Sequence, residues 1–167
     1  MTEKPTRRER KQVQASKTCV DVDLVVNEKL GFYKDDRTRS VMDFEAWLTD
    51  VLMRDRKQSR TKKDRCEICN SKEDYSKLEL HHYGGVKHDF RTVTACKRCH
   101  DILSKWQEQW DLRWQECDQP EHLRKAFVLS GLRDMLVLKT RFTGDTMYEE
   151  YADYFVDEIH ALRSDRH

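Results

Sequence analysis

Apolar side chains recur with a helical period along much of the 167-residue chain. Residues 43–57 predict one such helix, with Asp43 as its N-cap. Its apolar face is formed by Phe44, Trp47, Leu48, Val51 and Leu52. From residue 97 a second stripe contains Ile102, Leu103, Trp106, Trp110 and Trp114. Residues 118–121 predict a helix start, with Pro120 in the first turn and an apolar helix through about residue 138. A last helix from about residue 146 carries Tyr148, Tyr151, Ala152, Phe155, Ile159 and Leu162.

Alternation with period two predicts short strands between these helices. Residues 19–26 alternate well enough for one strand. Residues 77–83 alternate and end at Gly84-Gly85, and the β-rich residues 91–95 suit an antiparallel partner. The pattern therefore predicts an α+β fold that is mostly helical.

The composition narrows the class of protein. The chain has only 5 Gly and 2 Pro, which argues against a turn-rich sandwich or barrel. No apolar run approaches the roughly 20 residues of a membrane span, and residues 1–17 lack the hydrophobic stretch of a signal peptide. We therefore expect a soluble, cytoplasmic protein without a membrane partner.

Charge is distributed unevenly although the formal net charge is only +1. Residues 1–104 carry 23 Lys/Arg against 18 Asp/Glu, a net of +5, whereas residues 105–167 carry 9 against 13, a net of −4. Residues 54–65 alone hold seven basic and two acidic side chains, and the arm at residues 1–17 holds six and two. Such runs are either solvated faces or phosphate-binding segments.

Four of the six cysteines form two Cys-x-x-Cys pairs, Cys66-Glu-Ile-Cys69 and Cys96-Lys-Arg-Cys99. Paired motifs of this kind in an intracellular chain indicate metal binding, because disulfides are kept reduced there. Two such pairs complete a tetrahedral Cys₄ zinc site with no open position, which makes the zinc structural. The alternatives are four unrelated thiols or a redox pair, although a redox motif usually occurs singly.

These signals divide the chain into four parts. Residues 1–17 form a flexible basic arm, and residues 18–61 contain a strand, a helix and a basic linker. Residues 62–104 form the zinc module, and residues 105–167 form a helical C-terminal extension.

The zinc module resembles the HNH endonucleases of the zinc-knuckle subtype. The resemblance covers residues 62–104 and rests on Cys66-Glu-Ile-Cys69, Leu78-Glu-Leu-His-His-Tyr83 and Val93-Thr-Ala-Cys-Lys-Arg-Cys-His-Asp-Ile-Leu103. It implies a ββα-metal, treble-clef-like fold and metal-dependent hydrolysis of DNA phosphodiester bonds. By position, His82 matches the general base, and His81 and His100 match the ligands of a catalytic Mg²⁺ or Mn²⁺.

Residue chemistry is compatible with these implied roles. Neighbouring residues on a strand point to opposite faces, so His81 and His82 suit different tasks. His100 lies in the first turn of a helix, whose N-terminal dipole favours a phosphate nearby. The alternative interpretation is that His81 and His82 are ordinary strand residues and that His100 is a surface residue at a helix end.

One position departs from the resemblance. The family usually has Asn five positions before the third zinc cysteine, and this chain has Arg91. Arg91 can brace the loop by hydrogen bonds or contact phosphate and so assist catalysis; alternatively, its presence means weak or lost catalysis.

The expected partner is DNA, with phosphate contacts from the basic segment through Arg56, Lys57, Arg60, Lys62 and Lys63. The alternative function is a non-catalytic zinc module that binds nucleic acid or protein, or an adaptor that works through its helical C-terminal half. The tryptophan stripe is interpreted as helix packing rather than base stacking. The last helix is expected to pack on the preceding helix or on a second copy, which allows a homodimer.

Overall fold

The computed structural model describes residues 39–164. The predicted basic arm at residues 1–17, Cys19 and the predicted strand at residues 19–26 lie outside the described residues. The elements follow in the order α3 (Arg39–Met53), β1 (Leu78–His82), β2 (Thr92–Cys96), α4 (Lys97–Gln107), α5 (Glu121–Thr143) and α6 (Met147–Ser164). This part of the chain is therefore α+β and mostly helical, as the sequence predicts.

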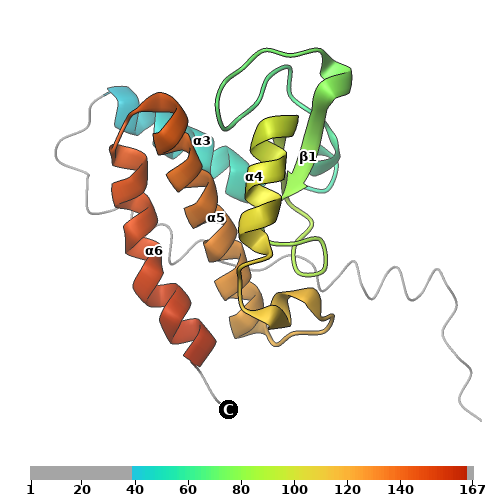
Figure 1. Cartoon of the computed structure of the whole chain (residues 1–167), viewed down its shortest axis with the longest axis vertical. Helices are drawn as coiled ribbons and strands as arrows, with labels where there is room; N and C mark the ends of the chain where they lie inside the picture. Colours follow the sequence, from blue (N-terminus) through green and yellow to red (C-terminus); the bar gives the residue numbers. More distant parts are fainter. Residues whose placement is uncertain (1–38, 165–167) are drawn as a thin grey trace, which may run out of the picture.

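The helix α5 forms the centre of the fold. It runs beside α6, and α4 lies between α5 and the strand β1 (Figure 1). Buried residues occur on every side of α5, from Leu123 to Leu138, as expected for a helix that is covered all round. None of the helices in residues 39–164 is long and apolar enough to cross a membrane.

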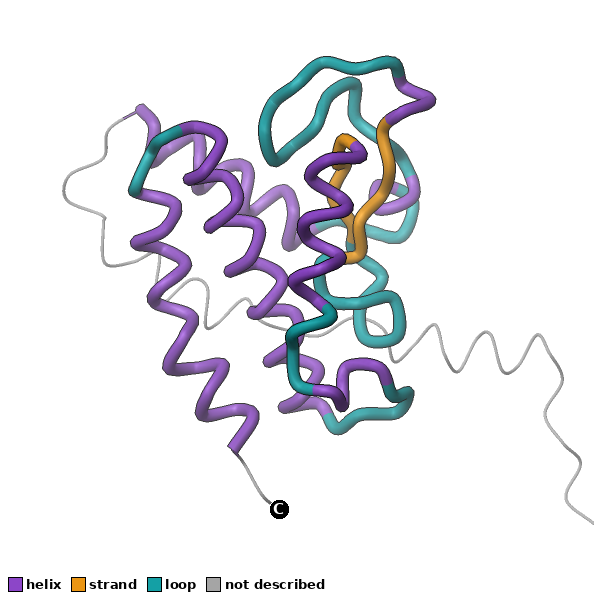
Figure 2. Tube along the Cα trace, in the orientation of Figure 1, coloured by secondary structure: helices purple, strands orange, loops and turns teal. Residues whose placement is uncertain are grey.

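The strands β1 and β2 form an antiparallel hairpin, which confirms the sequence prediction (Figure 2). Leu78 pairs with Cys96 and His82 pairs with Thr92. All five residues of β2 are buried, so β2 is the inner strand. Because α4 begins at the residue after β2, the register places Cys96 and Cys99 beside the start of β1.

A single hydrophobic core joins the hairpin to the helices. It includes Leu78, Val93 and Ala95 of the hairpin together with Phe44 and Leu48 of α3. The apolar stripe of α6 also lies in this core, and Tyr151, Ala152, Phe155 and Ile159 are buried. The stripe packs on the preceding helix within the chain, so it gives no support to a homodimer, which stays a prediction.

Both ends of helix α3 differ from the prediction. Helix α3 begins four residues before Asp43, which is therefore not its N-cap, and it ends at Met53 instead of residue 57. The next side chain, Arg54, donates hydrogen bonds to Glu67 and to the carbonyl of Thr92. Arg54 is only 7% exposed, and its ion pair fixes the direction of the following loop.

The tryptophan stripe does not continue on one helix. Helix α4 ends at Gln107, and Trp110 and Trp114 lie in the chain that follows. The Trp110 ring is parallel to that of Phe127 with centroids 6.3 Å apart, and it meets Trp114 edge to face at 6.0 Å. These two tryptophans have the packing role that the sequence predicts, but in a turn between helices.

Helix α5 extends beyond the predicted residue 138 to Thr143. Pro120 is its N-cap and lies just before the first turn. Gly144, at φ +74°, ends the helix in the left-handed conformation that glycine adopts without strain.

Gly131 marks the closest approach between α5 and the hairpin. A Cβ atom there would lie 1.7 Å from the carbonyl oxygen of Tyr83, the residue that follows β1. A side chain at residue 131 would therefore push α5 away from the hairpin.

We expect Gly131→Ala to lower the free energy of unfolding by about 2 kcal/mol or more, because overpacking outweighs the roughly 1 kcal/mol gain in helix propensity. Urea unfolding followed by circular dichroism measures the change. Ser130→Ala, one residue earlier, is the matched control and should have a small effect. A Gly131→Ala protein as stable as the parent would show that the two backbones are not in close contact.

Candidate metal centre

The four cysteines of the two Cys-x-x-Cys pairs come together at one point of the fold. Their Sγ atoms all lie within 4.8 Å of one another, and three of the four side chains are buried. The Sγ atoms of Cys69 and Cys96 are 3.8 Å apart. Thiolates bound to one tetrahedral zinc at roughly 2.3 Å would lie about 3.8 Å apart. The cluster could therefore hold a metal ion such as zinc.

Local backbone structure explains why the first pair adopts this arrangement. The amide of Asn70 donates to the carbonyl of Cys66 at 2.9 Å, and the amide of Cys66 donates to the carbonyl of Ser71 at 3.0 Å. Asn70 has φ +59°, in the left-handed region that asparagine tolerates better than most residues. The loop is thereby closed into a tight turn that directs both thiols inward.

The turn prepares a thiolate for a metal ion. A hydrogen bond from the Cys99 thiol lowers the pKa of Cys66 to about 4, and backbone amides, including those of Ile68 and Cys69, lower it further against the effect of burial. Metal ions bind the thiolate rather than the thiol. The backbone amides between the cysteines thus point at sulfur, as the two-residue spacing predicts.

Glu67 attaches this turn to the hairpin. Its amide donates to the carbonyl of Thr94 at 2.8 Å, and its carboxylate accepts from the amide of Thr94 at 2.7 Å. The same buried carboxylate forms an ion pair with Arg54. Burial raises the pKa of Glu67, but Arg54, the amide of Thr94 and Lys63 together lower it below its usual value, so the pair remains charged. No motif reveals this connection, because Arg54 and Thr94 lie 13 and 27 residues from Glu67 along the chain.

Lys139 brings a positive charge from α5 to the cysteine cluster. Its Nζ donates to the carbonyl of Glu67 at 2.6 Å and lies 4.5 Å from the centroid of the Trp47 ring. Burial lowers the pKa of Lys139, and the charges of Glu67 and of the cysteines Cys66, Cys69 and Cys99 act in the opposite direction. A cation here favours thiolates, which makes Lys139 a residue of the candidate metal centre that sequence reasoning missed.

A second group of polar side chains lies where β1 meets α4. The rings of His81 and His100 are perpendicular, with centroids 5.3 Å apart. The Nδ1 atom of His100 lies 3.1 Å from Oε2 of the Glu79 carboxylate. A carboxylate beside Nδ1 favours a proton on that nitrogen and an unprotonated Nε2 in the neutral ring, the form in which histidine binds metals.

His81 is nearly enclosed, at 4% exposure. Burial lowers its pKa to about 3, with smaller contributions from His100 and His82, so its imidazole is neutral at pH 7. The side-chain amide of Gln107 donates to the carbonyl of His82 at 2.8 Å, and its Nε2 lies 3.3 Å from Nε2 of His81. Gln107 therefore fixes the end of β1 against the end of α4.

His82, the predicted general base, is half-buried on the strand face opposite to His81. Burial lowers the pKa of His82, and the charge of Asp89 partly opposes this shift. The structure thus brings His81 and His100 together and turns His82 towards the loop between the strands.

Arg91 lies in that loop with its side chain only 3% exposed. Its guanidinium donates to both carboxylate oxygens of Asp89, at 2.9 and 2.8 Å, and to the carbonyl of Leu52 at 2.9 Å. The guanidinium thus braces the loop against α3. Contact with a phosphate would require it to leave this ion pair.

The five basic residues predicted to bind DNA divide into two groups. Lys62 donates to the carbonyls of Tyr75 and Leu78, and Lys63 pairs with Asp50 at 2.7 Å, so both help to hold the loop before the first cysteine pair. Lys57, Arg60 and Arg56 are exposed, and the Arg56 guanidinium lies 4.6 Å from the centroid of the Phe90 ring.

Comparisons of the chain with protein-family models, with curated proteins and with solved structures found no match. The resemblance to the HNH endonucleases therefore depends on the residues of the chain itself. The membership of this chain in that family stays a prediction.

We expect elemental analysis to find one zinc ion per chain.

We expect the Lys139→Met protein to lose zinc to a chelator more readily than the parent, with a zinc affinity reduced roughly tenfold. The reason is that the thiolates lose the neighbouring positive charge. Lys105→Met, at an exposed position of α4, is the matched control, and Cys69→Ser should lose most of the metal. Equal zinc affinity in the Lys139→Met and Lys105→Met proteins would contradict a role for Lys139 at the cluster.

We expect Arg91→Asn to lower the free energy of unfolding by about 3–5 kcal/mol, because it leaves the carboxylate of Asp89 buried without its partner. Denaturant unfolding of the metal-loaded protein measures this change. The double variant Asp89→Asn/Arg91→Asn should regain part of the loss, and the exposed Arg65→Asn serves as the control. If Arg91→Asn alone is as stable as the parent, the ion pair does not brace the loop.

Proposed function

We propose that the chain is a metal-dependent endonuclease that hydrolyses DNA phosphodiester bonds with an HNH-type ββα-metal module. The observation that carries the proposal is the perpendicular pair of His81 and His100, 5.3 Å apart between ring centroids. Two imidazoles that bind one ion at roughly 2.1 Å have centroids about 4.6–5.3 Å apart for bond angles between octahedral and tetrahedral. The pair thus has the separation that a shared ion needs.

The surroundings of the pair support the same proposal. The Glu79 carboxylate lies 3.1 Å from Nδ1 of His100, in the position that carboxylates take beside histidine ligands in metal sites, where they favour one tautomer of the ring. The Cys₄ cluster lies at the start of the same helix, with Cys99 directly before His100. A zinc ion there would fix the start of α4 relative to β1, which carries His81 and Glu79.

In the proposed reaction, His81 and His100 would hold Mg²⁺ or Mn²⁺, which would stabilise the charge that develops on the scissile phosphate. His82 accepts a proton from the attacking water, for which its lowered pKa keeps the imidazole neutral at pH 7. Lys57, Arg60 and Arg56 contact the DNA backbone without reading its sequence. Nε2 of His81, which lies 3.3 Å from Nε2 of Gln107, would have to leave this contact in order to hold the ion.

A second candidate function is a non-catalytic zinc module that binds nucleic acid. The specific observation in its favour is the buried ion pair of Arg91 with Asp89, because an intramolecular contact stands where the resembling family has Asn.

We expect the protein to nick supercoiled plasmid DNA in Mg²⁺ or Mn²⁺, and His82→Ala to reduce the rate by about 10²–10⁴-fold because proton transfer is lost. Glu79→Gln should reduce it by about 10–100-fold, with recovery at high metal concentration, since it weakens the orientation of His100. His122→Ala, on α5, is the control for loss of a histidine. Plasmid that stays intact with the parent protein in every metal while DNA is still bound would favour the non-catalytic module.

A further inference from the structure

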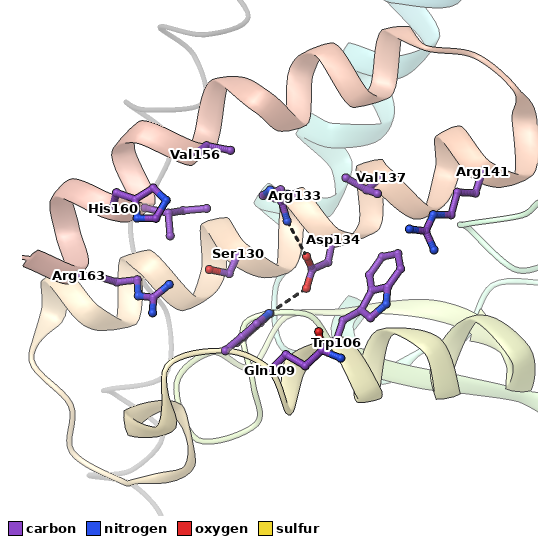
Figure 3. Close-up of a pocket in the computed structure, with 12 residues that line it drawn as sticks. Trp106, Gln109, Ser130, Arg133, Asp134, Val137, Arg141, Val156, His160 and Arg163 are labelled. Atoms are coloured by element: carbon purple, nitrogen blue, oxygen red, sulfur yellow. Dashed lines mark hydrogen bonds and ion pairs between the residues drawn. The ribbon is translucent and has the colours of Figure 1, made fainter.

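A cleft of about 410 Å³ opens between the end of α4 and the helices α5 and α6 (Figure 3). Small-molecule sites usually have volumes of roughly 300–1,000 Å³. The lining residues that carry chemistry are Trp106, Trp110, Arg133, Asp134, Arg141 and Arg163. None of them belongs to the candidate metal centre or to the histidine pair.

The cleft is positively charged within an acidic part of the chain. Residues 105–167 have a net charge of −4, yet three of their nine Lys/Arg residues line this cleft, against one carboxylate. The side chains of Arg133 and Arg163 are 41% and 37% exposed, and Arg141 is exposed. Arg163 pairs with Asp111 at 3.6 Å and Arg133 with Asp134 at 3.4 Å, but each side chain is exposed enough to offer further N–H groups to an anion. Arginine binds phosphate oxygens in pairs of hydrogen bonds.

Asp134 lies among these arginines and is only 7% exposed. Its carboxylate accepts from Nε1 of Trp110 at 2.9 Å, and Nη1 of Arg133 lies 3.4 Å away (Figure 3). Burial raises the pKa of Asp134 to about 6, although both neighbours oppose the shift. A carboxylate in such a position provides a hydrogen-bond acceptor for a polar group that enters the cleft.

One wall of the cleft suits a flat ring. The Arg141 guanidinium lies 4.8 Å from the centroid of the Trp106 ring, so a planar cation and an aromatic face are already paired there. A nucleobase stacks on a tryptophan ring or on an arginine guanidinium plane, and this stacking depends little on which of the bases it is.

We infer that this cleft binds a nucleotide, with its phosphate on Arg133 and Arg163, its base against Trp106 and Arg141, and a base or ribose donor on Asp134. An aromatic carboxylate fits less well, because Asp134 repels a ligand that has no donor to offer. The inference does not rest on the proposed nuclease activity, since it uses a different flank of α4.

Isothermal titration calorimetry of the full chain, without added divalent metal, tests the inference with AMP, GMP, CMP and dTMP. At least one of them should bind in a saturable manner at one site per chain, at least tenfold more tightly than adenosine or inorganic phosphate. Arg133→Gln and Arg141→Gln should each weaken the binding at least tenfold. Lys125→Gln, which removes a charge from α5 outside the cleft, should leave it unchanged.

Three results would overturn the inference: no saturable binding of any of the four nucleotides, binding of inorganic phosphate as tight as that of the best nucleotide, or full affinity in both arginine variants. Circular dichroism melting verifies that the variants are folded, which their exposed positions on α5 lead us to expect. Plasmid nicking by these variants is measured separately, so that loss of nucleotide binding and loss of nuclease activity can be told apart.

Discussion

The meeting of four thiols at one point is the constraint on which the rest of the structure depends. The Cys66 and Cys69 turn comes from a loop, whereas Cys96 ends β2 and Cys99 begins α4. A hairpin of two five-residue strands has too little apolar surface to be stable alone. A bound metal ion would fix the loop, the hairpin and the helix together, and its binding energy would contribute directly to folding.

Buried charges connect this point to the remainder of the fold. Arg54 at the end of α3 pairs with Glu67 of the cysteine turn, and Lys139 of α5 donates to the carbonyl of the same residue. Arg91 with Asp89 forms a second buried pair just before β2, next to Thr92, whose carbonyl accepts from Arg54. These buried charges are enclosed together with opposite charges, so removing one partner reduces the compensation of a buried charge. These ion pairs therefore determine how the hairpin is oriented on the helices.

The helix α4 contributes residues to two sites of different chemistry. Its first turn carries Cys99 and His100, which face the turn and β1. Its last turn carries Gln107, which holds the end of β1, and Trp106, which lines the cleft beside α5. The proposed metal-dependent chemistry and the proposed nucleotide site thus share one rigid element, which keeps their relative positions constant.

The local features of the fold follow from the amino-acid sequence. Periodicity of apolar residues located the helices and the hairpin, and the doubled Cys-x-x-Cys spacing located the cysteine cluster, because both depend on residues close together in the chain. Tertiary structure decided which distant groups meet. The ends of α3 and α4 were misjudged because Arg54 and Gln107 are directed by partners on other elements.

The same reason explains the site residues that no motif revealed. Lys139 reaches the cysteine turn across 72 positions of sequence, and Asp134 lies 24 positions from the Trp110 indole that it binds. Arg91 reads in the sequence as a departure from the resembling family, whereas the fold makes it the partner of a buried carboxylate. Spacing fixes which side chains share a strand or helix face, but only the packing of α5 and α6 on the hairpin decides which charges become buried neighbours.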